Sequence, residues 1–485
     1  MGIVFKQSSR NTLIIFLAFA IGGFNTLFLY TSFLTPQYYG LVVFLLSAAN
    51  LLMPLTAFGV QYTIVKFFAS YQSKEEKDKF LSTVLLFPLF VAIPIGFLIT
   101  LFYKEISTYL SLKNELIEGY TFVIYLIAIA TAYFEVFYAW AKVHFQSVVG
   151  NAIKELYHRI STFILLILIW MEVINPQQFI WLMTASYFLR MLIMLFYALK
   201  LYTPKFTFAK PTNFNEIIRY SFYIILAGSA GAILLDIDKV MLPQKEAIEL
   251  AAYYTVGVFI ASVIEIPNRA MTQIVQPLTS KALQENNLTE VASLYKRSSL
   301  NLLVLGGLFF LLVNLNITDL YKIIPDKDYS SGIYIVFMIS VVKLSTMSIG
   351  NNGAIISNSK YYKILLPYAV VMAISVSFLN NWFINLYGMN GAALSTLVVV
   401  LIFNSLKIWY VKKKFDMMPF SKKTPLLVFI ILLVFASFYF WNFSFHPIVN
   451  ISLKSIFITL AYVYIIKKTQ ISDEINAVLS KYLKF

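Results

Sequence analysis

The feature that most constrains this chain is the recurrence of long apolar segments along almost its whole length. A helix rises about 1.5 Å per residue, so roughly 20 apolar residues span the hydrocarbon core of a bilayer. Fourteen segments reach or approach that length, and we therefore predict an all-α polytopic membrane protein. They lie at approximately 12–34, 41–64, 81–103, 120–141, 152–173, 179–199, 217–238, 251–275, 299–315, 332–350, 362–380, 389–410, 425–442 and 449–466.

The overall composition agrees with this prediction. Apolar residues make up 59% of the 485 residues and charged residues only 13%, whereas soluble domains average about 45–50% and about 25%. A chain this long has too little polar surface to coat a soluble core. With no cysteine and only three histidines, it has no thiolate site and no histidine spacing typical of zinc. We expect no cofactor, no metal site and no enzyme.

The fifth segment, 152–173, is the weakest of the fourteen. Its purely apolar part, 163–170, is too short to cross a bilayer alone, so the helix must include the mixed stretch 148–159. Polar groups inside a membrane need partners. We therefore expect residues 148–159 to face protein or water rather than lipid.

The net charge of +15 comes from lysines and arginines that recur in alternate loops. Positively charged loops stay on the cytoplasmic side of a membrane, and this bias places both termini in the cytoplasm. The basic residues are spread over many short loops, so we expect no nucleic-acid partner. No loop is long enough for an ectodomain or a catalytic domain, which favours a transporter.

A short repeat divides the chain into similar parts. Residues 38–44 align with 253–259, and the same offset matches Ser47 with Ser262 and Lys66 with Lys281. We predict a six-span bundle in residues 1–210, a second in 211–415, and two further spans with a basic tail in 416–485. Parallel bundles of this kind place a substrate site between them, near the membrane midplane.

Several charged residues in the spans have candidate partners nearby on their own helix. Glu265 and Arg269 are four residues apart, Asp236 and Lys239 are three apart, and Glu135 has Lys142 two turns away. Such pairs neutralise charge within a helix. The acids Glu135, Asp236 and Glu265 could instead couple transport to H⁺ or Na⁺, and the sequence leaves both roles open.

Arg190 and Lys343 differ because each lies in the middle of a span with no acid on that helix. A charge at a span centre is costly and marks a functional site by default. One cation in each predicted bundle suggests a positive cavity for an anionic substrate, with Arg190 and Lys343 as its ligands. The alternative is that each pairs with Glu135, Asp236 or Glu265 of another helix.

Several short stretches, in order along about four-fifths of the chain, resemble the polysaccharide exporter family of lipid-linked oligosaccharide flippases. This family belongs to the multidrug/oligosaccharidyl-lipid/polysaccharide flippase superfamily. The stretches are 34–41 (LTPQYYGL), 57–60 (AFGV), 66–68 (KFF), 235–242 (LDIDKVML), 252–254 (AYY), 266–267 (IP), 276–277 (QP), 351–352 (NN), 359–363 (SKYYK) and 387–393 (YGMNGAA).

The resemblance implies a MATE-like fold of two six-helix bundles plus two C-terminal helices, in a bacterial inner membrane. It implies outward transport of an undecaprenyl-pyrophosphate-linked oligosaccharide for a surface polysaccharide such as the O-antigen of lipopolysaccharide. It also implies ion coupling, contact with membrane lipids and cooperation with a polysaccharide polymerase. The alternatives are a multidrug exporter, a lipid II flippase or, in another class, a membrane-embedded polymerase or ligase.

Overall fold

The computed structural model describes residues 2–441 and 443–482, and within them every regular element is a helix. Twelve helices in this part of the chain are long and apolar enough to cross a membrane. The predicted all-α polytopic fold is therefore confirmed. The predicted total of fourteen spans is approximate, because two segments fall short of that length or polarity.

The two exceptions have clear physical reasons. The fifth predicted segment forms three short elements between Ser147 and Trp170, and it carries four charged or imidazole side chains in its first half. The thirteenth forms the apolar helix α19 (Thr424–Tyr439), which has only 16 residues. The other twelve predicted segments each overlap one of the twelve long apolar helices.

Contacts within the chain divide it into two compact units, of which the first ends at Ala252 and the second begins at Tyr253. Helix α11 (Phe214–Met241) packs on α3 (Pro36–Thr56) and α4 (Val60–Phe67), so its contacts lie in the first unit. The sequence-based division at residues 210 and 415 concerns repeated bundles rather than contacts, and it stays a prediction.

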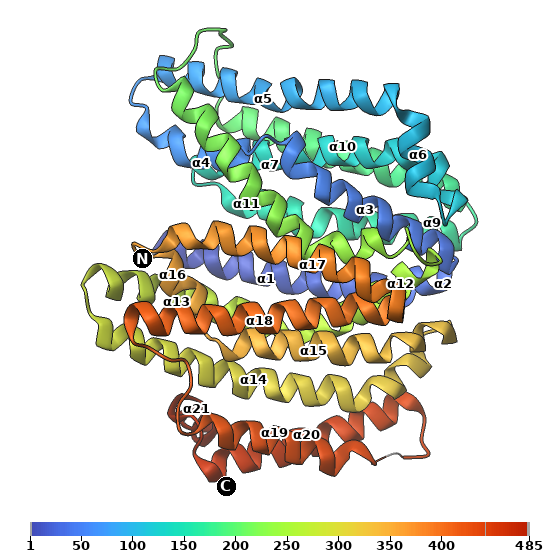
Figure 1. Ribbon diagram of the computed structural model, residues 1–485, viewed down its shortest axis with the longest axis vertical. Helices are drawn as coiled ribbons and strands as arrows, with labels where there is room; N and C mark the ends of the chain where they lie inside the picture. The colour runs from blue at the N-terminus through green and yellow to red at the C-terminus, as the bar shows by residue number, and fades with distance from the viewer. Residues whose placement is uncertain (1, 442, 483–485) are drawn as a thin grey trace. The chain divides into compact units, whose positions relative to one another are not determined.

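The first unit is built around α7, which contacts α3, α4, α5 and α10; Figure 1 labels these helices and α11. Its elements, in chain order, are α1 (Gly2–Phe24), η1 (Asn25–Leu29), α2 (Tyr30–Phe33), α3, α4, η2 (Phe68–Ser70), α5 (Lys74–Leu101), α6 (Tyr103–Ser111), η3 (Glu115–Tyr120), α7 (Thr121–Val143), α8 (Ser147–Ala152), η4 (Ile153–Tyr157), α9 (His158–Trp170), α10 (Pro176–Leu201) and α11.

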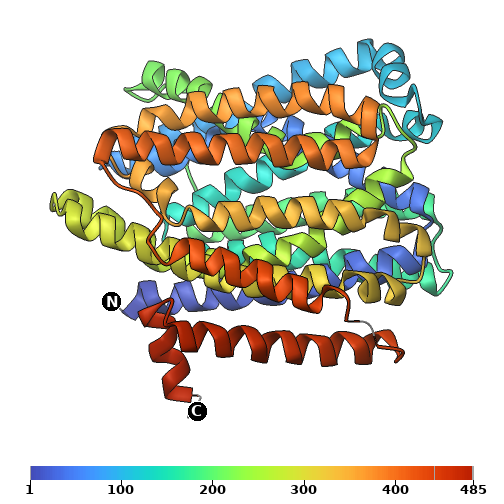
Figure 2. The same cartoon turned by 60° about the horizontal axis from the view of Figure 1, so that its bottom comes forward.

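In the second unit, the long helix α14 contacts α13, α15, α19 and α20. Figure 2 shows α19 and α20 in red, side by side, with α21 turning away at the end of α20. The elements are α12 (Glu249–Ser262), η5 (Val263–Glu265), α13 (Ile266–Gln284), α14 (Leu288–Ile323), η6 (Lys327–Gly332), α15 (Ile333–Ser348), α16 (Asn352–Ser357), η7 (Tyr362–Ile364), α17 (Leu365–Tyr387), α18 (Met389–Phe415), α19, α20 (Pro447–Thr469) and α21 (Asp473–Tyr482).

A sharp break splits the predicted span 41–64 into α3 and α4. Pro54 lies in the last turn of α3, and Phe58 and Gly59 both adopt positive φ angles, of 51° and 66°. Left-handed residues end a right-handed helix, and glycine adopts this conformation without steric cost. The chain therefore changes direction at residues 57–59 and begins a new helix at Val60.

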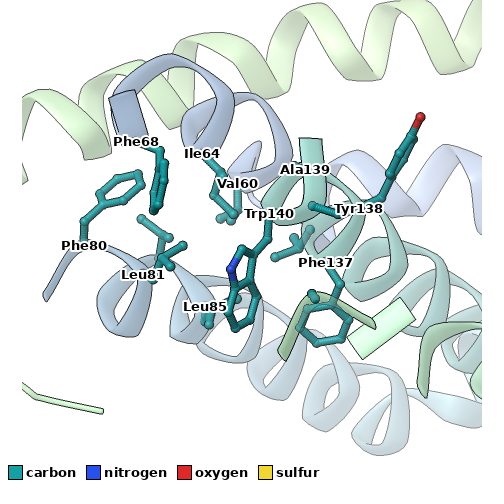
Figure 3. Close-up of a cluster of buried hydrophobic side chains, with 14 of the residues drawn as sticks. Val60, Ile64, Phe68, Phe80, Leu81, Leu85, Phe137, Tyr138, Ala139 and Trp140 are labelled. Carbon is teal, nitrogen blue, oxygen red and sulfur yellow. The ribbon is translucent and has the colours of Figure 1, made fainter. Parts of the chain in front are cut away.

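The core of the first unit lies where α4, α5 and α7 meet (Figure 3). Trp140 of α7 is 1% exposed and is surrounded by apolar side chains, including Ile64 and Leu85. Tyr138 directs its ring away from this cluster in Figure 3. One face of α7 is thus fixed in a dry core, and the position of its other face follows from that anchoring.

Candidate functional site

A cavity of about 720 Å³ lies within the first unit. It is walled by α3, α4, α7, η4, α9, α10 and α11. Twelve of the nineteen lining residues are polar, which is unusual for the interior of an apolar protein. These are Asn50, Gln61, Tyr62, Thr131, Glu135, Lys154, Glu155, His158, Arg159, Tyr187, Arg190 and Asp236.

The polar part of the fifth segment supplies four of these side chains. Residues 153–157 form one turn of π-helix, a local widening that is frequent at functional sites. Lys154 and Glu155 belong to this turn, and His158 and Arg159 follow it at the start of α9. The stretch predicted to face protein or water therefore lines a cavity within the protein.

Three ion pairs hold the acids of this site. Glu135 pairs with Lys154 at 2.7 Å, Glu155 with Arg159 at 2.9 Å, and Asp236 with Lys239 at 2.8 Å. The pairing of Asp236 with Lys239 matches the expectation from spacing. Glu135 departs from it, because its partner comes from η4 rather than from Lys142 of its own helix.

Asp236 also accepts hydrogen bonds from two side chains of α3. The Ser47 hydroxyl and the Asn50 amide lie 3.3 Å and 3.2 Å from its carboxylate oxygens. Together with Lys239, they surround this carboxylate with three donors. These three donors fix the position of the Asp236 side chain at one side of the cavity.

Arg190 has a different environment from the other bases. It is 6% exposed, its guanidinium lies over the rings of Phe134 and Tyr187, and its Nε has no hydrogen-bond partner in the described structure. Among the described residues, no carboxylate lies within ion-pair distance of it. A buried cation without an anion is costly, so Arg190 is the group here most in need of an anionic ligand.

The charges around the cavity do not cancel. Three bases (Lys154, Arg159 and Arg190) and three acids (Glu135, Glu155 and Asp236) line it. Asp236 is paired by Lys239, which is not a lining residue, so the lining together with this partner carries one net positive charge. Because each acid already has a base, that charge belongs to Arg190. Arg190 therefore has no ion pair of its own to break before it binds an anion.

A second cavity of about 650 Å³ adjoins the first. The two share Met53, Gln61, Tyr62, Glu135 and Lys154 as lining residues. The second is further lined by Lys66, Lys142 and Tyr220, among others. The Glu135–Lys154 ion pair thus lies on the boundary between two spaces.

Lys343 belongs to the second unit, and its environment is not that of Arg190. Its ammonium lies 2.6 Å from the Glu265 carboxylate, and both side chains are about a quarter exposed. Glu265 ends η5, at the interruption between α12 and α13, and Arg269 is exposed one turn later on α13. Of the two cations predicted to lie at span centres, Lys343 therefore has an acidic partner on another helix, as the alternative interpretation held.

Sequence reasoning identified Glu135, Asp236 and Arg190, which the structure brings to one cavity. It did not assign a site role to Lys154, Glu155, His158 or Arg159. The signal was present, because these four residues interrupt an apolar segment with a spacing of one helical turn. Gly231 was also missed: a Cβ there would meet no atom within 4 Å, so this residue keeps the cavity open.

Residues 8–283 match the family described as polysaccharide biosynthesis protein. This match covers more than half of the chain. A comparison of the sequence with curated proteins finds no match.

Solved structures of transporters share the fold. A lipid II flippase, MurJ in an inward closed conformation, aligns with a TM-score of 0.70 and 15% identity over 95% of this chain and 99% of that one. A multidrug resistance MATE transporter in an inward-facing conformation gives 0.65 and 12%, over 82% and 94%. A MATE transporter in a bent conformation gives 0.54 and 14%, over 86% and 96%. These neighbours are transporters and flippases rather than enzymes.

Proposed function

Since the chain belongs to the polysaccharide biosynthesis protein family, we propose that it is a flippase for an undecaprenyl-pyrophosphate-linked oligosaccharide. It is a multi-pass membrane protein of the MATE and MurJ type. In the proposed cycle it works by alternating access in a bacterial inner membrane, with both termini cytoplasmic, and it delivers its substrate to a polymerase for assembly of a surface polysaccharide.

The observation that carries this proposal is the unpaired, buried guanidinium of Arg190 in a polar cavity. A diphosphate carries the charge that this site lacks, and an arginine can donate two parallel hydrogen bonds to one phosphate. The amide and hydroxyl groups of Asn50, Gln61 and Thr131 can hydrogen-bond the sugar hydroxyls. The prenyl chain, which is apolar, remains in lipid.

In this proposal Lys343 is a second residue that binds the anion. The anion must first displace Glu265, with which Lys343 is paired. The pair distance of 2.6 Å makes this a competition between a carboxylate and a phosphate. We assign to Glu135, Asp236 and Glu265 the exchange of H⁺ or Na⁺ that resets the cycle, and to Arg269 a role beside Glu265.

The test compares Arg190→Ala and Lys343→Ala, singly and together, in a strain that lacks the chromosomal copy. We expect Arg190→Ala to abolish export and to accumulate the lipid-linked oligosaccharide on the inner leaflet, while the protein level in the membrane stays unchanged. Arg219→Ala is the matched control, because Arg219 is exposed on α11 and lines neither cavity. Full export by the double variant would overturn the site assignment.

Lipid II is a second candidate substrate, because the MurJ structure matches 95% of this chain. It carries the same prenyl diphosphate and differs in the head group attached to it. Proteoliposomes that contain both lipids would distinguish the two substrates, since the preferred lipid becomes accessible to an enzyme outside the vesicles first.

A multidrug exporter usually expels cationic amphiphiles, which Arg190 would repel. The drug sensitivity of a deletion strain should therefore be unchanged.

A further inference from the structure

We infer that the second cavity is a separate anion-binding station, the lysine vestibule, lined by Lys66, Lys142 and Lys154. In this inference it takes the diphosphate of the lipid-linked substrate before Arg190 does, and the Glu135–Lys154 ion pair must open for the transfer. This inference rests on the proposed function and adds an order of binding to it.

The first two lysines of the vestibule are held by aromatic rings instead of acids. The Lys66 ammonium lies 3.8 Å from the centre of the Tyr220 ring and 4.7 Å from that of Phe67. The Lys142 ammonium lies 4.3 Å from the centre of the Tyr138 ring. Among the described residues, neither has a carboxylate within ion-pair distance. Rings orient a cation without cancelling its charge, so neither ammonium is neutralised by a neighbouring acid.

The vestibule is more positive than the Arg190 cavity. Its lining contains three lysines and a single acid, Glu135, which gives two net positive charges. A diphosphate diester carries about two negative charges, so the two match. Lysine is a flexible point charge that accepts a ligand in many orientations, whereas arginine fixes it in one. This difference suits lysines for capture and Arg190 for precise holding.

Glu135 and Lys154 line both cavities, and no other ion pair among the described residues does so. While the pair is closed at 2.7 Å, Glu135 neutralises Lys154 and places a negative charge in the path of an anion. A phosphate in the vestibule can take Lys154 from Glu135, because the two anions compete for the same ammonium. Lys154 can then accompany the phosphate toward Arg190.

The experiment measures binding of undecaprenyl pyrophosphate to the full-length protein in nanodiscs, with phosphatidylglycerol as the competing anionic headgroup. We expect the double variant Lys66→Gln and Lys142→Gln to weaken binding about tenfold, as the loss of charge-assisted contacts does. Lys281→Gln is the control, because this lysine is 73% exposed and lines neither cavity. Equal affinity in the double variant and the control would overturn the inference.

The ion pair is tested by opposite effects on affinity. Glu135→Gln frees Lys154 and should strengthen binding about threefold, whereas Lys154→Gln leaves a bare carboxylate and should weaken it. A purely structural pair would lower thermal stability in both variants and move affinity in neither direction. If both variants bound the lipid more weakly than wild type, the proposed transfer of Lys154 from Glu135 to the phosphate would be contradicted.

Failure of this inference differs from failure of the proposed function. If Arg190→Ala loses binding while the vestibule variants bind normally, only the vestibule is wrong. If wild-type protein does not bind the diphosphate lipid, both assignments fall. If phosphatidylglycerol displaces the probe at equal concentration, the lysines recognise ordinary lipid headgroups, and the vestibule is not a substrate station.

Discussion

The guanidinium of Arg190 lies 4.4 Å from the centre of the Phe134 ring, and the two residues come from neighbouring helices, α10 and α7. The centre of the Tyr187 ring lies 4.8 Å from the same group. The guanidinium thus lies against two aromatic rings, and no acid among the described residues is within ion-pair distance of it. Its position therefore depends on aromatic neighbours rather than on an acid that would compete with a substrate.

Replacing Phe134 by leucine should reduce transport while leaving Arg190 in place. The aromatic face contributes about 1–2 kcal/mol to a buried cation, so we expect transport to slow by about 10-fold. The measurement is the rate of lipid flipping in proteoliposomes. Phe137→Leu is the matched control, since Phe137 belongs to the same core and makes no contact with Arg190 among the described ring contacts. Equal rates in the two variants would show that only packing matters.

Replacing Gly231 by leucine should block the cavity without unfolding the protein. A Cβ at this position meets open space, and the side chain would project into a cavity of about 720 Å³. We expect transport to fall to background and the melting temperature to stay within a few degrees. Gly353→Leu, whose Cβ also meets open space but which lines neither cavity, should keep normal transport. Active Gly231→Leu protein would contradict the placement of the substrate here.

Replacing Gly391 by alanine should destabilise the second unit. A Cβ on Gly391 of α18 would overlap the backbone carbonyl of Phe383 in α17, and backbone cannot move aside as a side chain does. Overpacking of this kind typically costs about 1–3 kcal/mol. Thermal unfolding in detergent should show the loss, and Gly353→Ala should show none. An unchanged melting temperature for Gly391→Ala would contradict the close approach of α17 and α18.

The sequence predicted twelve of the spans because apolar length is a local property that each helix carries by itself. It could not predict the break at Phe58 and Gly59, since an apolar run continues through both residues. It also matched Glu135 with Lys142, which lie on one helix, and not with Lys154. Ion pairs between helices depend on rotation and depth, which periodicity alone does not fix.

The site was predicted only in part, because the sequence does not show which helices meet. Arg190 stood out because no acid lies on its own helix, and the structure gives it a cavity and two aromatic rings. Lys343 had the same signal, yet it pairs with Glu265. A residue's own helix shows whether a local partner exists, but a neighbouring helix decides whether the charge is free.

Docking of α21 should weaken in acid. Burial alone would raise the pKa of Glu474, but hydrogen bonds from its own backbone N–H, Arg297 and Ser472 outweigh it and lower the pKa below the ordinary 4.5. An acid whose pKa is lower in the folded than in the unfolded protein stabilises the fold at pH values above its unfolded-state pKa. This stabilisation is lost as the pH falls through its folded-state pKa. The protection of α21 amides against hydrogen exchange, relative to the intrinsic rate at each pH, should therefore fall below about pH 4.5.

The same measurement on Glu474→Gln supplies the control for this pH effect. A glutamine keeps the shape of the side chain but cannot gain a proton. The protection of α21 against exchange should therefore be weaker than in wild type at neutral pH and should change little on acidification. A second contact, from the Lys423 ammonium to the Gln470 carbonyl at 2.7 Å, keeps the helix near its place in both proteins. If the variant showed the same dependence on pH as the wild-type protein, the role of Glu474 would be contradicted.

The π turn at Ile153–Tyr157 determines how the continuous helical segment from α8 to α9 responds to a change in length. It holds one residue more than an ordinary turn, and each residue in a helix corresponds to about 100° of rotation. Deleting a single amino acid there would leave a continuous helix but swing everything before it by that angle relative to His158 and Arg159. Lys154 would then point in another direction. The one extra residue of the π turn therefore sets the rotation that directs the Lys154 charge.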